Sequence, residues 1–148
     1  MFPGPFHTRT GATPTQAAAL VDAVRNYPVA KITAADMAVT TDQVFTWLVS
    51  PVPTLYIPRR VIGRRVSGAF GVACLGGCYT AASKGGTAFV AATQSWANLT
   101  AGGKIVDATL IAGVGTDIIT AALLYFALTT ANTGALTADI YLFADILG

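Results

Sequence analysis

The residues of this chain that could perform chemistry are few and scattered. The one histidine, His7, lies between Phe6 and Thr8, ahead of any predicted helix or strand. A catalytic triad or a zinc site requires its histidine to meet partners that are held rigidly in place. We therefore interpret His7 as a residue of an N-terminal arm and not as a base or a metal ligand.

All seven acidic residues are aspartates, and Asp139 and Asp145 face the same side of one predicted strand. Six residues of extended strand separate two Cα atoms by about 20 Å. Glycosidase carboxylates lie about 5 to 9.5 Å apart, so this pair cannot act on one glycosidic bond. Pairs across strands with Asp107 or Asp117 stay open, although aspartates also commonly mark turns and strand ends.

Other catalytic patterns are missing from the sequence. Gly85-Gly86 is not followed by the Lys-Ser/Thr and the helix of a phosphate-binding loop. Ser67 and Ser83 lack the flanking pattern of a nucleophile elbow. We predict that the chain is not an enzyme, and we expect it to use no metal and no other cofactor.

The two cysteines, Cys74 and Cys78, lie four residues apart in a stretch with strand character. Extended chain of that length spans about 13 Å, whereas a disulfide needs Cα atoms within about 7 Å. A bulge at Gly76-Gly77 could shorten the distance, but the spacing favours two buried free thiols. Without a cluster of histidines, two cysteines do not make a zinc site.

The densest charge feature is a group of four arginines: Arg59, Arg60, Arg64 and Arg65. Strand alternation would turn Arg60 and Arg64 to one face and Arg59 and Arg65 to the other. Such a split, with a net charge of only +2, does not predict a nucleic-acid partner. Two interpretations stay open: a solvated edge strand that blocks unwanted pairing, and a contact to an acidic patch on another subunit.

The first 38 residues are predicted to form an N-terminal arm followed by one short helix. Phe2 and Phe6 stand among prolines and glycines without helical or strand periodicity. Thr13, Pro14 and Gln16 form a helix-start signal, and Pro28 ends the segment. Within this helix Leu20 and Val24 belong to an apolar stripe that needs a partner. We therefore expect Phe2, Phe6, Leu20 and Val24, with the four arginines, to lie at an interface.

From about Ile32 the apolar period changes to two, which is typical of strands. Turn signals such as Ser83-Lys84-Gly85-Gly86 separate the alternating stretches. The expected strands are 43–49, 55–57, 60–67, 69–82, 87–92, 104–110, 123–130 and 138–147, where 69–82 is either one long strand or a bulged pair. This pattern predicts an all-β fold, a single β-sandwich or jelly roll, over residues 39–148.

The composition indicates that much of the surface of this domain is covered by other subunits. Hydrophobic residues make up 53% of the chain and charged residues 11%, against about 25% charged in an ordinary soluble domain. The most apolar window, 110–128, is interrupted by Asp117, two glycines and two threonines, so we expect no membrane span. We also find no signal-peptide pattern. The low charge predicts a homo-oligomer, most simply a trimer, whose surface is largely covered.

Three stretches carry a family resemblance: Gly76 to Ala82, Lys84 to Ala92 and Leu128 to Tyr141. They resemble small structural proteins encoded in the head gene clusters of tailed phages, over roughly 36–147. The resemblance implies a β-sandwich decoration or cement protein on the capsid exterior of a virion, with the major capsid protein or another virion subunit as its partner. Cysteines at 74 and 78 depart from the aliphatic residues expected there.

Alternatives to this role stay open. Within the same class the chain could be a tail, fibre-base or shell subunit. From other classes it could be a carbohydrate-binding or adhesion module, or a hydrolase on a jelly-roll scaffold. Trp47, Trp96 and the tyrosines could line a sugar site, although aromatics at strand spacing more often belong to a core. Because β-sandwiches host many functions, the fold alone does not decide among these.

Overall fold

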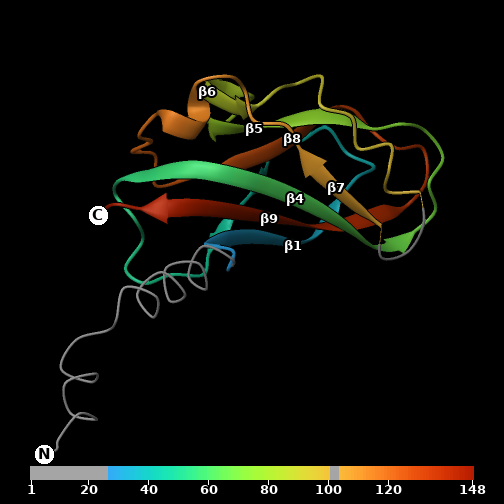
Figure 1. Ribbon diagram of the computed structural model, residues 1–148. Helices are drawn as coiled ribbons and strands as arrows, with labels where there is room; N and C mark the ends of the chain where they lie inside the picture. The colour runs from blue at the N-terminus through green and yellow to red at the C-terminus, as the bar shows by residue number, and fades with distance from the viewer. Residues whose placement is uncertain (1–26, 101–103) are drawn as a thin grey trace, which may run out of the picture.

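Two antiparallel sheets pack face to face in the computed structural model, which describes residues 27–100 and 104–148 (Figure 1). The strands are β1 (Ala30–Asp36), β2 (Gln43–Val44), β3 (Thr46–Trp47), β4 (Tyr56–Gly68), β5 (Leu75–Ala81), β6 (Gly85–Val90), β7 (Ile105–Ala108), β8 (Tyr125–Thr130) and β9 (Leu136–Ile146). One sheet has the order β3-β1-β9-β4-β7 and the other β2-β8-β5-β6. A single 3-10 turn, η1 (Val114–Thr116), is the only helical element of the described residues. The predicted all-β sandwich is confirmed.

The centre of the five-stranded sheet is the long pairing of β4 with β9, which runs from Tyr56 opposite Ile146 to Gly68 opposite Leu136. The predicted alternation of β9 is confirmed. Its even-numbered residues from 136 to 142 are fully buried, and Thr137 to Phe143 at odd positions are not. Ile146 departs from this pattern and is 41% exposed. Beyond the last inward position the strand leaves the core, so alternation no longer implies burial.

Strand β4 is one strand of 13 residues, where the sequence predicted two separate ones. The register against β9 shifts between Pro58 and Arg60, so Arg59 is an extra residue on β4. Proline has no N–H to give to a ladder and is tolerated in sheets mainly at bulges and edges. The bulge lets the strand continue past Pro58, and it changes the face to which the following side chains point.

The expected strand over 43–49 is divided between the two sheets. β2 pairs with β8 in the four-stranded sheet, whereas β3 pairs with β1 in the five-stranded sheet. The crossing residue, Phe45, is buried, and its N–H still donates to the Leu124 carbonyl at 2.9 Å. The chain therefore links the two sheets at this point without leaving the Phe45 N–H unpaired.

The sandwich begins ahead of the expected boundary at residue 39. β1 occupies 30–36 and is hydrogen-bonded on both sides, to β3 and to β9. Its alternation is broken near Ala34, which has φ of 51° and lies at a register shift against β9. Because of this irregularity, the buried residues of β1 do not follow a strict period of two. The predicted arm and helix over 1–26 lie outside the described residues.

The core between the sheets is centred on Trp96. Its ring meets Phe126 edge to face at 5.3 Å, and its indole N–H donates to the Gly76 carbonyl at 3.0 Å. A Cβ on Gly63 of β4 would lie 2.7 Å from the Trp96 ring, so only glycine admits the indole here. In the described part of the chain, no helix has the length and apolar character needed to cross a membrane.

Candidate interaction surfaces

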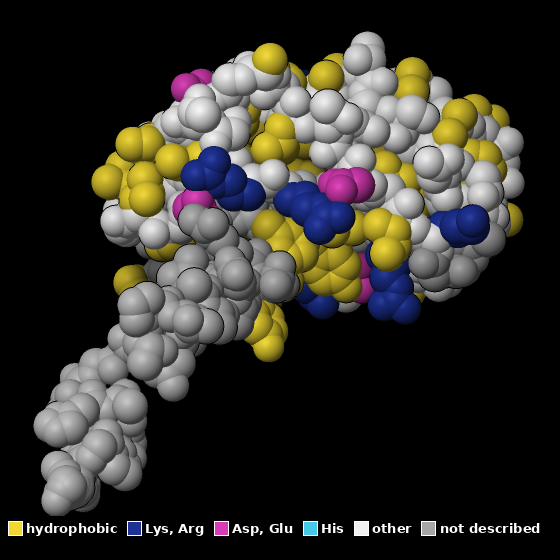
Figure 2. All heavy atoms as spheres, in the orientation of Figure 1, with side chains coloured by type: hydrophobic (Ala, Val, Ile, Leu, Met, Phe, Trp, Pro, Cys, Tyr) yellow, Lys and Arg dark blue, Asp and Glu magenta, His cyan; other side chains and the backbone are white. Residues whose placement is uncertain are grey.

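The arginines of β4 lie mainly on the outer face of the five-stranded sheet, each against a different partner. Arg59 donates from Nε to Asp145 Oδ2 at 2.7 Å and from Nη1 to the Gly115 carbonyl at 2.5 Å. Arg60 donates from Nε to Asp107 Oδ2 at 2.9 Å. Figure 2 shows basic and acidic side chains next to one another on the visible face.

The predicted division of the arginines between two faces is wrong for Arg59. The bulge at this residue leaves it on the same side as Arg60, within reach of the outward-facing Asp145 of β9. Arg65 differs from both: its Nη1 donates to the Thr100 carbonyl at 2.6 Å, and its Nε is buried without a hydrogen-bond partner. Arg64 stands opposite Asp139 in the ladder.

Strand β4 is not an edge strand, because β9 and β7 pair with its two sides. The interpretation of the arginines as guards of an exposed edge is therefore wrong. The charges of Arg59 and Arg60 are instead matched within the sheet, by Asp145 from β9 and Asp107 from β7. The outer face is thus a mosaic of both signs and not a stripe of positive charge.

Aromatic and aliphatic side chains lie between these charges. Lys31 places its Nζ 5.7 Å from the centroid of the Tyr141 ring, which is a cation–π distance. The Tyr141 hydroxyl donates to Asp139 Oδ2 at 3.1 Å. Burial raises the pKa of Tyr141, and the hydrogen bond to Asp139 raises it further. Ile62 and Phe143, half-buried on the same side of β4 and β9, complete a surface that is polar yet partly aromatic.

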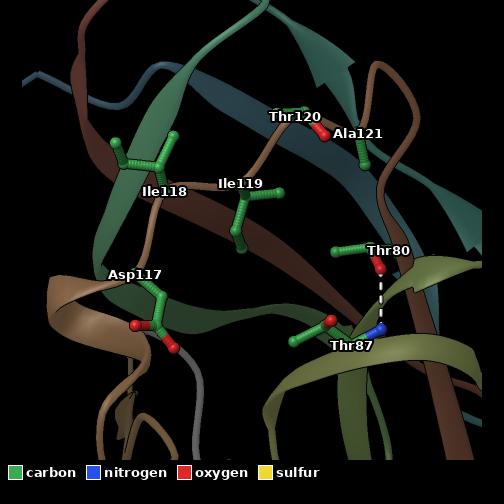
Figure 3. Close-up of a pocket in the computed structure, with 7 residues that line it drawn as sticks. All are labelled: Thr80, Thr87, Asp117, Ile118, Ile119, Thr120 and Ala121. Atoms are coloured by element: carbon green, nitrogen blue, oxygen red, sulfur yellow. Dashed lines mark hydrogen bonds between the residues drawn. The ribbon is translucent and has the colours of Figure 1, made fainter.

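A second feature is an open pocket of about 400 Å³ at one end of the sandwich (Figure 3). Seven residues line it: Thr80, Thr87, Asp117, Ile118, Ile119, Thr120 and Ala121. The Thr87 N–H donates to Thr80 Oγ1 at 2.8 Å, which fixes one hydroxyl at the wall. The pocket therefore offers three threonine hydroxyls and one carboxylate, which suits hydrogen bonding to a hydroxylated ligand. A pair of carboxylates for acid–base chemistry is not among its lining residues.

The aspartates that could have paired with one another across strands each contact a different group instead. Asp107 binds Arg60 and Asp145 binds Arg59 on the outer face, while Asp139 accepts from Tyr141 and Asp117 lines the pocket. Within the described ranges, no group of three or more His, Cys, Asp or Glu could hold a metal ion.

The third feature is a gathering of exposed apolar side chains at the end of the sandwich where β9 finishes. We call it the apolar end; it consists of Leu48, Val52, Leu55, Ile118, Leu123, Ile146 and Leu147, each 40% to 55% exposed. Backbone hydrogen bonds join the segments that carry them: Leu147 N–H to the Leu55 carbonyl at 2.8 Å, and Tyr56 N–H to the Ile119 carbonyl at 3.1 Å. Figure 2 shows hydrophobic side chains clustered at this end. Grouped exposure of this kind marks interaction sites, whereas single exposed apolar residues do not.

The cysteines lie inside the sandwich. Cys74 and Cys78 are both free thiols and both buried. Burial raises the pKa of each thiol, so the reactive thiolate is disfavoured at neutral pH. These thiols act as small apolar core residues, and neither lines the pocket.

The sequence did not predict the apolar end. For the arginines, the predicted face of Arg59 and the interpretation as an edge strand are wrong. Leu48, Val52 and Leu55 lie in the connection between β3 and β4, where no periodicity labels a side chain as inward or outward. The proposed arm contacts Phe2, Phe6, Leu20 and Val24 lie outside the described residues. Comparisons with protein-family models, with curated proteins and with solved structures give no match for this chain.

Proposed function

We propose that this chain is a structural subunit that works packed among other subunits, most specifically as a decoration or cement protein on the exterior of a tailed-phage capsid. The observation that carries the structural role is the apolar end, where seven large apolar side chains remain exposed in a chain with only 11% charged residues. The resemblance of 76–82, 84–92 and 128–141 to small phage head proteins supports the narrower, virion assignment.

The two surfaces suit different parts of that role. Burying apolar surface contributes roughly 25 cal/mol per Å², so the apolar end supplies a driving force for association. The outer face supplies orientation, because its Arg59–Asp145 and Arg60–Asp107 pairs present opposite charges at fixed positions. A subunit that must seat in one register on a shell benefits from both properties.

The first test concerns assembly of the purified chain. We expect a homo-oligomer, a trimer in the simplest case, in sedimentation equilibrium over a wide concentration range. A chain that stays monomeric at high concentration would contradict self-association. Binding to the shell is then measured separately, by co-sedimentation with capsids made from the major capsid protein.

The second test concerns the position of the protein in a virion. Mass spectrometry of purified particles and antibody labelling in electron micrographs should place it on the head exterior. Labelling of the tail or fibre base would replace the decoration role by one of the alternative structural roles. Its absence from purified particles would overturn the virion assignment while leaving the assembly measurement as it stands.

One observation favours a second candidate, a carbohydrate-binding or adhesion module. The pocket collects three threonine hydroxyls and the Asp117 carboxylate around about 400 Å³. The tryptophans do not add to it, because Trp96 is fully buried and Trp47 donates its indole N–H to the Ala122 carbonyl at 2.8 Å. A glycan array tests this candidate, with Asp117→Asn as the variant expected to lose any ligand that the pocket binds.

A further inference from the structure

We infer that the pocket at the end of the sandwich binds an amino sugar, that is, a hydroxylated ring that carries a protonated amine. This inference rests on the carbohydrate-binding candidate proposed above and names the class of ligand for the same site. The pocket of about 400 Å³ lies in the lower part of the volume range of small-molecule sites. Its lining combines one carboxylate, that of Asp117, with three threonine hydroxyls, and it includes no lysine or arginine.

Asp117 differs from the other described aspartates in the partners of its carboxylate. Those that accept a hydrogen bond or an ion pair are Asp36, Asp42, Asp107, Asp139 and Asp145. Within residues 27–100 and 104–148, no hydrogen bond or ion pair engages the Asp117 carboxylate. Arg59 donates to the Gly115 carbonyl, close to Asp117 in the chain, but its ion pair is with Asp145. The negative charge of the pocket is therefore available to a ligand.

The backbone around Asp117 sets the direction of this carboxylate. Asp117 has φ of −87° and ψ of 135°, so the chain is extended here and successive side chains alternate in direction. Figure 3 shows the side chains of Asp117 and Ile119 pointing to the same side of the segment and that of Ile118 pointing away. Asp117 and Ile119 thus form one polar and one apolar part of the same wall.

Hydrogen bonds hold both walls of the pocket in place. Ile119 exchanges two backbone hydrogen bonds with Tyr56, at 2.8 and 3.1 Å, and the Tyr56 hydroxyl donates to the Ala121 carbonyl at 2.7 Å. On the side across from Asp117 in Figure 3, the Thr87 N–H donates to Thr80 Oγ1 at 2.8 Å. A site that is ordered before binding spends less free energy on ordering when the ligand arrives.

The groups of the pocket match the two kinds of polar group on an amino sugar. A protonated amine donates to a carboxylate in a charge-assisted hydrogen bond, which is about twice as strong as a neutral one. Each threonine hydroxyl can donate one hydrogen bond and accept others. Thr80 Oγ1 already accepts from Thr87, so its O–H is left to donate to a ring hydroxyl. The carboxylate would therefore select the amine, and the threonines would hold the ring.

Glucosamine, N-acetylglucosamine and glucose, which share one ring, test the inference on the full chain. At about pH 6 the glucosamine amine is protonated, since an α-amino group loses its proton at about pH 8. We expect glucosamine to bind at least about tenfold more tightly than the other two sugars, because it adds a hydrogen bond between charged groups. At about pH 9 this advantage should disappear. NMR titrations read at the amides of Thr87 and Asp117 measure the dissociation constants.

Two aspartate variants locate the amine. Asp117→Asn should lower the affinity for glucosamine to that for glucose, and its unfolding midpoint should stay unchanged because this carboxylate holds no other described residue. Asp107→Asn is the matched control: it removes the same charge from another exposed aspartate, on the outer face, and should keep the preference for glucosamine. Thr120→Val removes a hydroxyl without changing the charge, so it should weaken all three sugars by a similar factor.

Four outcomes would overturn the inference. Equal binding of the three sugars would show that hydroxyls alone recognise the ring, and the carbohydrate candidate would stand without the amine. A preference for glucosamine that survives in Asp117→Asn, or is lost equally in Asp107→Asn, would place the amine outside the pocket. Equal affinity for Nα-acetyl-lysine amide would show a site for any ammonium group. Failure of all three sugars to bind would remove the carbohydrate candidate as well, while sedimentation still judges the structural role independently.

Discussion

The outer face of the five-stranded sheet and the apolar end differ in whether their exposed side chains have partners within the same domain. On the outer face, Arg59, Arg60 and Tyr141 each have a hydrogen-bonded acidic partner within the same sheet. At the apolar end, the exposed side chains are aliphatic and have no such interaction to make. The first surface is already stable in contact with water, whereas the second gains free energy only when something covers it.

This difference separates two properties that interfaces usually mix. Electrostatic complementarity mainly sets orientation and specificity, while apolar burial supplies most of the driving force. The chain carries the two on different parts of its surface, so single substitutions can perturb one and leave the other intact. Each surface can therefore be tested with the other as its internal reference.

The largest expected effect is on association through the apolar end. Ile118→Asp and Leu123→Asp, made together, should weaken self-association by at least about tenfold, or 1.4 kcal/mol, because a buried contact would then have to desolvate two carboxylates. Both residues are more than half exposed, so the unfolding midpoint should change little. Sedimentation and thermal unfolding measure the two quantities. Val66→Asp, also exposed but at the other end of β4, is the control; equal weakening by this variant would contradict a special role for the apolar end.

The next effect is a dependence of stability on pH, and it concerns Tyr56, a buried residue next to the apolar end. Tyr56 is fully buried and donates its hydroxyl to the Ala121 carbonyl at 2.7 Å, which holds the segment that carries Ile118. Burial raises the pKa of Tyr56 above its ordinary value of 10.0. The folded pKa is the higher one, so this contribution to stability is complete below about pH 10 and is lost as the pH rises through the folded value.

Denaturation curves between neutral and strongly alkaline pH measure this dependence. In Tyr56→Phe the alkaline loss of stability should be smaller, and the variant should cost about 1 kcal/mol at neutral pH, the usual net value of one hydrogen bond. Tyr141→Phe on the outer face is the comparison, since Tyr141 is only half-buried. If both variants flatten the curve equally, burial at the apolar end is not the cause.

The sequence predicts the regular parts of this fold because period-two alternation reports burial directly. Leu124, Phe126 and Leu128 stand at alternate positions of the expected strand 123–130, and all three are buried. Alternation fails where the backbone is irregular. The bulge at Arg59 and the change of sheet at Phe45 each alter which face a side chain meets, and neither has a residue signal beyond Pro58.

The candidate surfaces were less predictable for a related reason. Asp139 and Asp145 were expected to face away from the core beside Tyr141, and they do. Their partners come from strands far away in the sequence, and pairing Asp145 with Arg59 depends on the bulge. The apolar end combines loop residues with the last residues of β9, so only the tertiary structure brings Leu55 next to Leu147.

On the outer face, the larger effect is expected for Arg59. Its guanidinium binds Asp145, whose side chain is only 19% exposed, and also the Gly115 carbonyl next to η1. Arg59→Ala should destabilise the fold by about 1 kcal/mol, toward the upper end for a partly exposed ion pair. Arg59→Lys keeps the charge but loses the forked geometry, so it should recover only part of this loss. Chemical denaturation measures both variants, and a loss fully restored by lysine would show that charge alone matters.

The smallest effect is expected for Arg60 and Asp107, whose side chains are 55% and 53% exposed. The hydrogen bond from Arg60 to Asp107 raises the pKa of Arg60, but solvent screens this attraction and two long, exposed side chains must be ordered to make it. A double-mutant cycle with Arg60→Ala and Asp107→Ala should give a coupling free energy below about 1 kcal/mol. It should fall further as salt shortens the screening length. A coupling as large as the Arg59→Ala loss, and insensitive to salt, would mean that exposure does not distinguish the two pairs, and the outer face would then contribute to stability as much as to orientation.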